Sequence, residues 1–173
     1  MNQLFYGDNL DILRDRVADE SVDLIYLDPP FNSNRNYNVL FQEKSGEDSA
    51  SQIEVFTDTW AWNMDAEYAY NDLTTSPPAN VAAMIEAMRQ FIGANDMMAY
   101  LVMMTQRIKE LHRVLKPTGS LYLHCDPTAS HYLKILLDTV FGKDRFLSEI
   151  SWRRTGAHSD GKQGRKNLGH IRD

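Results

Sequence analysis

The sequence has little sulfur chemistry and no long apolar run: Cys125 is the single cysteine among 173 residues. One cysteine excludes a disulfide within the chain and suits a reducing compartment. No stretch approaches the roughly 20 apolar residues that cross a bilayer. The N-terminus, MNQLFYGDNL, lacks the basic flank and apolar core of a signal peptide. We therefore expect a cytoplasmic protein without a membrane segment.

Histidine and cysteine, the usual zinc ligands, are also sparse, with five and one in the chain. His124, Cys125 and Asp126 adjoin, but the chain has no CxxC pair and no second His/Cys cluster to complete a four-ligand site. We expect no metal. A structural role at the end of a strand and a role in lining a pocket both remain open for these three residues.

Net positive charge is absent from the chain as a whole, which carries a formal charge of −6. Its distribution is uneven. Residues 153–173 hold six Lys/Arg and two Asp/Glu, a balance of +4, so the other 152 residues have a balance of −10. Such asymmetry is typical of a nucleic-acid contact segment on an acidic body, although a solvated tail has the same composition.

Hydrophobic periodicity predicts alternating strands and helices. Helices are expected from a cap at Asp8, over 81–92 closed by Gly93, from a cap at Asp96 to Leu115, and over 133–140 closed by Gly142. Residues 32–62 show little periodicity and are expected to form a mobile surface loop. The expected strands are 4–7, 22–27, 120–125 and 146–152. This order predicts an α/β domain with a largely parallel sheet, whose strand 22–27 is buried on both faces.

The segment LDPPF directly follows strand 22–27. Ligands of open α/β sheets bind at the carboxyl ends of the strands. Pro29 and Pro30 lack an N–H and stiffen the backbone, and each restrains the residue before it to extended geometry. The result is a rigid set of acceptors, the Asp28 carboxylate and peptide carbonyls, beside the ring of Phe31.

A planar ring with an exocyclic amine suits these acceptors. Two oxygens accept the two N–H hydrogens while the aromatic side chain stacks on the ring. Holding the nitrogen near tetrahedral geometry frees its lone pair for attack on an electrophilic carbon, and positioning of this kind contributes about 7–11 kcal/mol. The fixed oxygens also stabilise the positive charge that develops. A Pro-Pro turn with an incidental acid is the alternative.

Five segments of the chain, the DPPF tetrapeptide and four others, resemble one family. DPPF looks like the Asp-Pro-Pro-Tyr/Phe motif of amino-methyltransferases that act on adenine in DNA. The preceding YGDNLDILRD resembles the segment that opens the permuted, β-type group. VLKPTGSLYLHCD, LLDTVFGKDRFLSEISWRR and the final GAHSDGKQGRKNLGHIRD are similar to that group in its usual order. The resemblance covers almost the whole chain. It implies a partial Rossmann-like methyltransferase fold, with a mostly parallel sheet and helices on both faces.

The resemblance also implies residue roles. Asp28, Pro29, Pro30 and Phe31 would bind a flipped adenine, and Asp8 and Asp28 would contact S-adenosylmethionine. Residues 1–152 would be the catalytic-motif half of the domain, and 153–173 the start of a basic target-recognition segment. The expected partner is double-stranded DNA, together with a possible restriction endonuclease. The expected DNA contacts are Asn32, Arg153, Arg154, Lys162, Arg165 and Lys166.

A glycine loop for the methyl donor is missing: the chain contains neither GxGxxG nor the family's FxGxG. In the permuted group the cofactor half follows the recognition region. We therefore expect a site-specific adenine-N6 DNA methyltransferase or its N-terminal fragment, with another polypeptide supplying the rest as the alternative to a fragment; the activity of this chain alone stays open. Because half a sheet exposes an apolar edge, we expect the chain to self-associate or to need its missing half. The alternatives are a non-catalytic DNA-binding or assembly module, and a methyltransferase acting on cytosine N4 or RNA adenine.

Overall fold

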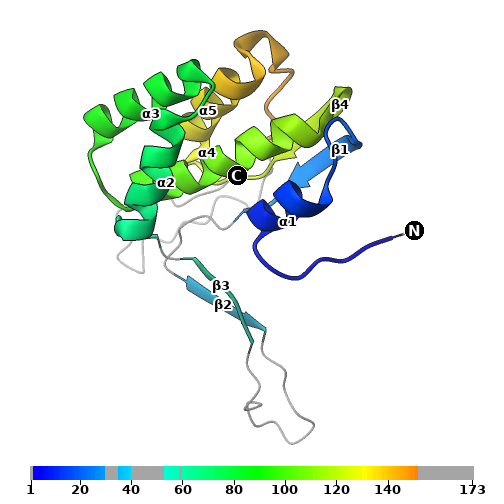
Figure 1. The fold of residues 1–173 in the computed structure, drawn as a ribbon, viewed down its shortest axis with the longest axis horizontal. Helices are drawn as coiled ribbons and strands as arrows, with labels where there is room; N and C mark the ends of the chain where they lie inside the picture. Colours follow the sequence, from blue (N-terminus) through cyan, green and yellow to red (C-terminus); the bar gives the residue numbers. More distant parts are fainter. Residues whose placement is uncertain (1, 30–34, 40–52, 59, 152–173) are drawn as a thin grey trace, which may run out of the picture.

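The protein combines a layer of helices with a small sheet and a separate hairpin (Figure 1). The computed structural model describes residues 2–29, 35–39, 53–58 and 60–151. The elements are α1 (Asn9–Arg16), β1 (Val22–Leu27), β2 (Arg35–Val39), β3 (Ile53–Asp58), α2 (Met64–Thr75), α3 (Ala79–Ile92), α4 (Asp96–Val114), β4 (Leu115–Leu123), α5 (Ser130–Phe141) and a short 3-10 helix, η1 (Lys143–Arg145). Within this part of the chain no helix is long and apolar enough to span a membrane.

Strands β1 and β4 form a parallel pair, which the helical segments between them make possible. Their registered pairs run from Leu24 with Ser120 to Leu27 with Leu123, and the register shifts after Val22 pairs with Leu115. Residues 116–119 therefore bulge from β4. At Gly119 a Cβ atom would lie 2.6 Å from the Leu115 side chain and 3.1 Å from a backbone carbonyl of β1, so any other residue would require Leu115 and the strand to shift.

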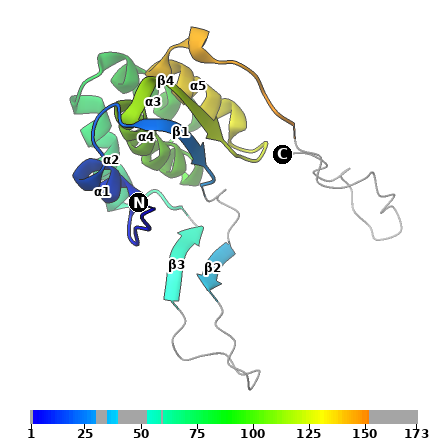
Figure 2. The ribbon, with the colours of Figure 1, turned by 90° about the vertical axis from the view of Figure 1, so that its right-hand side faces the viewer.

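One face of this sheet is covered by helices. Ile25 of β1 packs with Leu111 and Val114 of α4, and Leu13 of α1 packs against the same cluster. The opposite face is open in the described part of the chain, where Leu24, Tyr26 and Tyr122 are 59%, 66% and 48% exposed. Figure 2 looks onto the sheet, with α3, α4 and α5 behind it. The prediction of helices on both faces, with strand 22–27 buried on both, is therefore wrong for the residues described.

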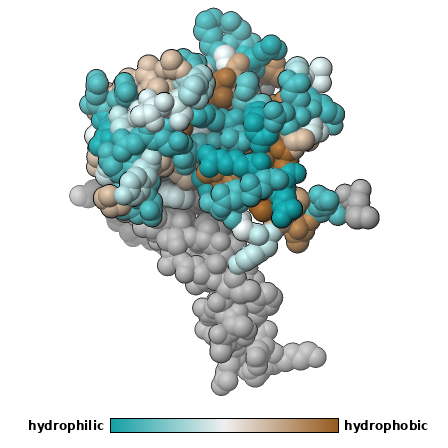
Figure 3. Space-filling view, in the orientation of Figure 1, coloured by the Kyte–Doolittle hydropathy of each residue, from teal (hydrophilic) through white to brown (hydrophobic). Residues whose placement is uncertain are grey.

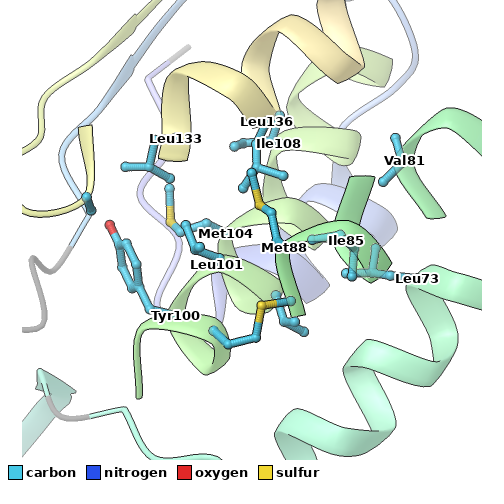
Figure 4. Close-up of a cluster of buried hydrophobic side chains, with 13 residues drawn as sticks. Leu73, Val81, Ile85, Met88, Tyr100, Leu101, Met104, Ile108, Leu133 and Leu136 are labelled. Carbon is cyan, nitrogen blue, oxygen red and sulfur yellow. The ribbon is translucent and has the colours of Figure 1, made fainter. Parts of the chain in front are cut away.

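The largest core lies among α2, α3, α4 and α5, and the last residues of β1 and β4 pack against its margin. Helix α4 is its centre, because ten of its side chains are buried, and it contacts all the other helices named here. Figure 4 shows these side chains converging from the four helices. The fully buried members with the largest volumes are Tyr100, Leu73, Ile85, Met98, Leu101, Met104, Ile108, Leu133, Leu136, Val81, Val102 and Val114. The methionine-rich start of α4 is thus packed core.

The expected helix boundaries are largely confirmed. Asp8 caps α1 by accepting a hydrogen bond from the backbone N of Leu10 at 2.8 Å. Gly93 and Gly142 end α3 and α5 with φ of 79° and 94°, where glycine alone is unstrained. The predicted cap of α4 at Asp96 is wrong by one residue, because Asn95 accepts from the backbone N of Met98 at 3.0 Å.

Other predicted elements are wrong. Residues 4–7 and 146–151 are not strands. The strand expected at 120–125 runs over Leu115–Leu123 instead. Part of the predicted loop 32–62 is an antiparallel hairpin of β2 and β3, while its middle lies outside the described residues. Helix α2 was not predicted, because its buried face contains little besides Leu73.

Two arginines of α4 hold both ends of α1. At its N-terminus Arg107 donates to both carboxylate oxygens of Asp8, at 2.7 and 2.8 Å. At its C-terminus Arg113 donates to the carbonyls of Leu13 and Val17, at 2.7 and 3.1 Å, and pairs with Asp19. A cation there binds carbonyls that have no partner within the helix. Hydrogen bonds to carboxylates raise the pKa of Arg113, so it stays charged.

Candidate active site

The carboxyl ends of the two parallel strands meet at one edge of the sheet (Figure 2). Their last registered pair is Leu27 with Leu123, and the backbone N of His124 donates to the carbonyl of Leu27 at 2.9 Å. Asp28 and His124 therefore leave adjacent strands side by side. This is the position at which open α/β sheets bind their ligands.

The side chain of Asp28 is exposed, whereas the next residue, Pro29, is buried. The alternation follows the strand: Ile25, Leu27 and Pro29 turn toward the helices, and Tyr26 and Asp28 turn outward. Among the residues that the structure describes, the Asp28 carboxylate has no hydrogen-bond partner, and the buried Pro29 anchors the backbone next to it.

The neighbouring strand end carries His124, Cys125 and Asp126. The ring of His124 lies beside Tyr26, with Nδ1 3.5 Å from the tyrosine hydroxyl oxygen. Cys125 packs against the main hydrophobic core. Asp126 accepts hydrogen bonds from the backbone N and the hydroxyl of Thr128, at 3.0 and 3.1 Å, and so shapes the turn into α5. For Asp126 the structural role fits best.

Asp8 has a different environment from Asp28. Its carboxylate caps α1 and accepts hydrogen bonds from the Arg107 guanidinium at both oxygens. It is half-exposed, so some of its acceptor capacity faces solvent. Of the two acids expected to contact S-adenosylmethionine, Asp28 therefore has the carboxylate that makes no hydrogen bond within the described part of the chain. The carboxylate of Asp28 fits a ligand with N–H or O–H donors, and the part of Asp8 in cofactor binding stays a prediction.

The two tryptophans that follow β3 are anchors in the helical layer. Trp62 donates its indole N–H to Glu67 at 2.9 Å, and Arg89 donates to both oxygens of the same carboxylate at 3.0 and 3.1 Å. The guanidinium also stacks over Trp62 and Tyr70, at 4.8 and 4.2 Å from their ring centroids. The bond to Glu67 raises the pKa of Arg89. Sequence reasoning missed this network because its members are not linked by any local spacing.

The remaining predicted site residues lie outside the described residues. They are Pro30, Phe31, Asn32, Arg153, Arg154, Lys162, Arg165 and Lys166. Their roles in base stacking and DNA contact stay predictions.

Comparison with known proteins identifies the class. Residues 22–170 match the N6/N4 methyltransferase family, described as DNA methylase. The chain is 29% identical over 156 residues to the type III restriction-modification enzyme StyLTI Mod subunit of Salmonella typhimurium, covering 88% of this chain and 20% of that protein. It is 24% identical over 168 residues to the type II methyltransferase M.EcaI of Enterobacter cloacae, covering 96% of this chain and 27% of the relative.

A third relative, the type II methyltransferase M.KpnI of Klebsiella pneumoniae, is 22% identical over 169 residues, which are 96% of this chain and 30% of M.KpnI. The chain therefore belongs to the N6/N4 DNA methylase family. Membership implies a Rossmann-like fold, and the described residues show two parallel strands and five α-helices of it. The chain spans only 20–30% of the length of these three relatives.

Proposed function

We propose that the protein is, or forms part of, a site-specific DNA adenine-N6 methyltransferase. The observation that carries the proposal is the exposed Asp28 carboxylate at the carboxyl end of β1, directly before the buried Pro29. Family membership supports the transfer of a methyl group to an exocyclic amine in DNA. The Asp form of the DPPF segment, which resembles that of adenine enzymes, favours adenine over cytosine.

In the proposed reaction the protein binds and orients the amine of a base flipped from the duplex. The Asp28 carboxylate and the Pro29 carbonyl accept its two hydrogens, and Phe31 stacks on the ring. S-adenosylmethionine supplies the methyl group when bound. The amine nitrogen would accept this methyl group, and solvent or the Asp28 carboxylate would take the amine proton that leaves. Fixed acceptors stabilise the charge that develops on nitrogen.

The test is transfer of radiolabelled methyl groups from S-adenosylmethionine to DNA, followed by digestion and identification of the modified nucleoside. We expect N6-methyladenine. Detection of N4-methylcytosine instead would show that the substrate base is cytosine and not adenine. Binding of DNA without binding of the cofactor, measured by calorimetry, would favour a DNA-binding or assembly module over an enzyme.

The relatives suggest two partners for this protein, DNA and a restriction endonuclease. The StyLTI relative is named as the Mod subunit of a type III restriction-modification enzyme. We infer double-stranded DNA as the substrate and a restriction endonuclease as a candidate partner. Co-purification of the protein with an endonuclease encoded beside it would test the second point.

The open face of the sheet predicts a further contact. Leu24, Tyr26 and Tyr122 form an apolar patch on it, and burying one such side chain contributes about 1.5–3 kcal/mol. Apolar residues also border α1 in Figure 3, whereas the surface over α3 and α4 is mainly hydrophilic. We propose that a second copy of the chain covers this face.

We expect the isolated chain to associate as its concentration rises, and the double substitution Leu24→Glu, Tyr122→Glu to return it to a monomer. Sedimentation velocity measures both. The control is Tyr68→Glu on α2, which changes a tyrosine of similar exposure, 65%, away from the sheet. A wild-type chain that stays monomeric at every concentration would contradict the proposed self-association.

A further inference from the structure

Tyr100 is an unusual member of the main core. Its side chain is fully buried on α4, among aliphatic and methionine side chains. Figure 4 shows its ring at the margin of the cluster, with the hydroxyl directed away from Leu101 and Met104. The hydroxyl oxygen is shielded from solvent. Phenylalanine would fill the same space, so the hydroxyl serves some purpose other than packing.

Trp60 brings a second polar group to the same margin. Its ring lies 6.1 Å from that of Tyr100, centroid to centroid, at an interplanar angle of 53°. The indole nitrogen Nε1 is also shielded from solvent. Burying a hydroxyl or an indole N–H is unfavourable unless each finds an acceptor. Two buried donors on neighbouring rings therefore indicate that acceptor groups lie at this corner of the molecule and that the two donors hold them in place.

The strand ends occupy that corner. Leu27 and Leu123, the last residues of β1 and β4, pack against the cluster that contains Tyr100, as do Trp60 and Cys125. Two residues beyond Leu27 the chain is buried again at Pro29. The aromatic pair formed by Trp60 and Tyr100 thus lies on the helical side of the segment whose outward side presents Asp28.

We propose that Tyr100 and Trp60 are positioning residues, whose donors hold the segment of Asp28 and Pro29 from the core side. The inference deepens the proposed function, because it concerns the same site. Methyl transfer requires the acceptor oxygens to be held near the amine, and displacement of a reacting group by about 1 Å lowers rates by as much as 10²-fold. The aromatic pair acts on the reaction only through the position of Asp28 and Pro29.

Cys125 offers a direct reporter of this corner. It is the single cysteine, it is half-buried, and it packs against the same cluster beside the strand ends. The substitution Tyr100→Phe removes one oxygen and leaves the ring. Loosening of the corner by one lost hydrogen bond should raise the rate at which an aromatic disulfide reagent labels the Cys125 thiol by about fivefold to tenfold. Trp60→Phe should act in the same direction.

Two control variants separate local from general effects. Tyr122→Phe removes a hydroxyl from the open face of the sheet and should change the labelling rate less than twofold. Leu73→Ala opens a cavity in α2, in the same cluster but on another helix, and should lower the melting temperature with little change in native-state labelling. An unchanged rate in Tyr100→Phe would overturn the inference, as would equal acceleration in Leu73→Ala.

The kinetic experiment tests the link to the reaction. In Tyr100→Phe we expect kcat to fall about tenfold, with the KM for S-adenosylmethionine unchanged. A normal kcat would overturn the positioning role. If the wild-type protein transfers no methyl group in any form, the proposed function fails, whereas thiol labelling still decides whether Tyr100 holds the strand-end corner.

Discussion

Replacing Asp28 with alanine should lower methyl transfer on the order of 10³-fold and leave the stability of the fold unchanged. The substitution removes the carboxylate expected to accept an amine hydrogen and to stabilise charge on nitrogen. Because the side chain is exposed beyond the end of β1, its loss leaves no cavity and no buried group unpaired. The measurement is the initial rate of methyl transfer, in the protein form for which the wild type is active, together with a thermal unfolding curve.

Matched variants sharpen this comparison. Asp23→Ala removes another exposed acid of β1, one paired with Lys116 rather than placed at the strand end, and should retain wild-type transfer. Asp28→Asn keeps one acceptor oxygen and should retain more activity than Asp28→Ala. Full activity in Asp28→Ala would contradict the role proposed for this residue, while an early unfolding transition would show that the acid supports the fold.

Replacing Leu136 with alanine should lower the free energy of unfolding by about 2–5 kcal/mol. Leu136 is completely buried where α5 packs on α3 and α4, so the shortened side chain leaves a cavity in a closely packed core. The measurement is chemical denaturation followed by circular dichroism, with the free energy extrapolated to water.

The adjacent position gives the control. Ile135 is on the same helix but is 41% exposed, and Ile135→Ala should change stability by less than about 0.5–1 kcal/mol. Equal losses in the two variants would mean that α5 does not pack as the structure has it. A small loss in both would place the stabilising core elsewhere in the molecule.

The helix ends and strand β1 could be predicted from the sequence because they depend on nearby residues. The caps at Asp8, Gly93 and Gly142 and the apolar run of β1 act within a few residues, and the structure confirms each of them. The outward position of Asp28 also follows from strand alternation and the prolines after it. These features depend on neighbours along the chain, which is why pattern and spacing find them.

Features that depend on distant residues were missed or wrongly predicted. Burial of β1 on both faces was inferred from apolar residues alone, and which face is covered depends on α1 and α4. The bond network of Arg89 and Glu67 joins residues 22 positions apart. The alternating apolar residues of 146–151 resemble a strand, but no neighbour pairs with them in the described part of the chain.

The pairing of β1 with β4 bears on how the chain folds during synthesis. Tyr26 and His124, in contact at the strand ends, are 98 residues apart, and Arg113 reaches back 100 residues to Leu13. The ribosome therefore releases α1 and β1 well before their partners exist. Helices α2 to α4 can assemble first, because their contacts are closer in sequence. Until β4 emerges, the acids Asp23 and Asp28 on the nascent apolar strand disfavour its aggregation.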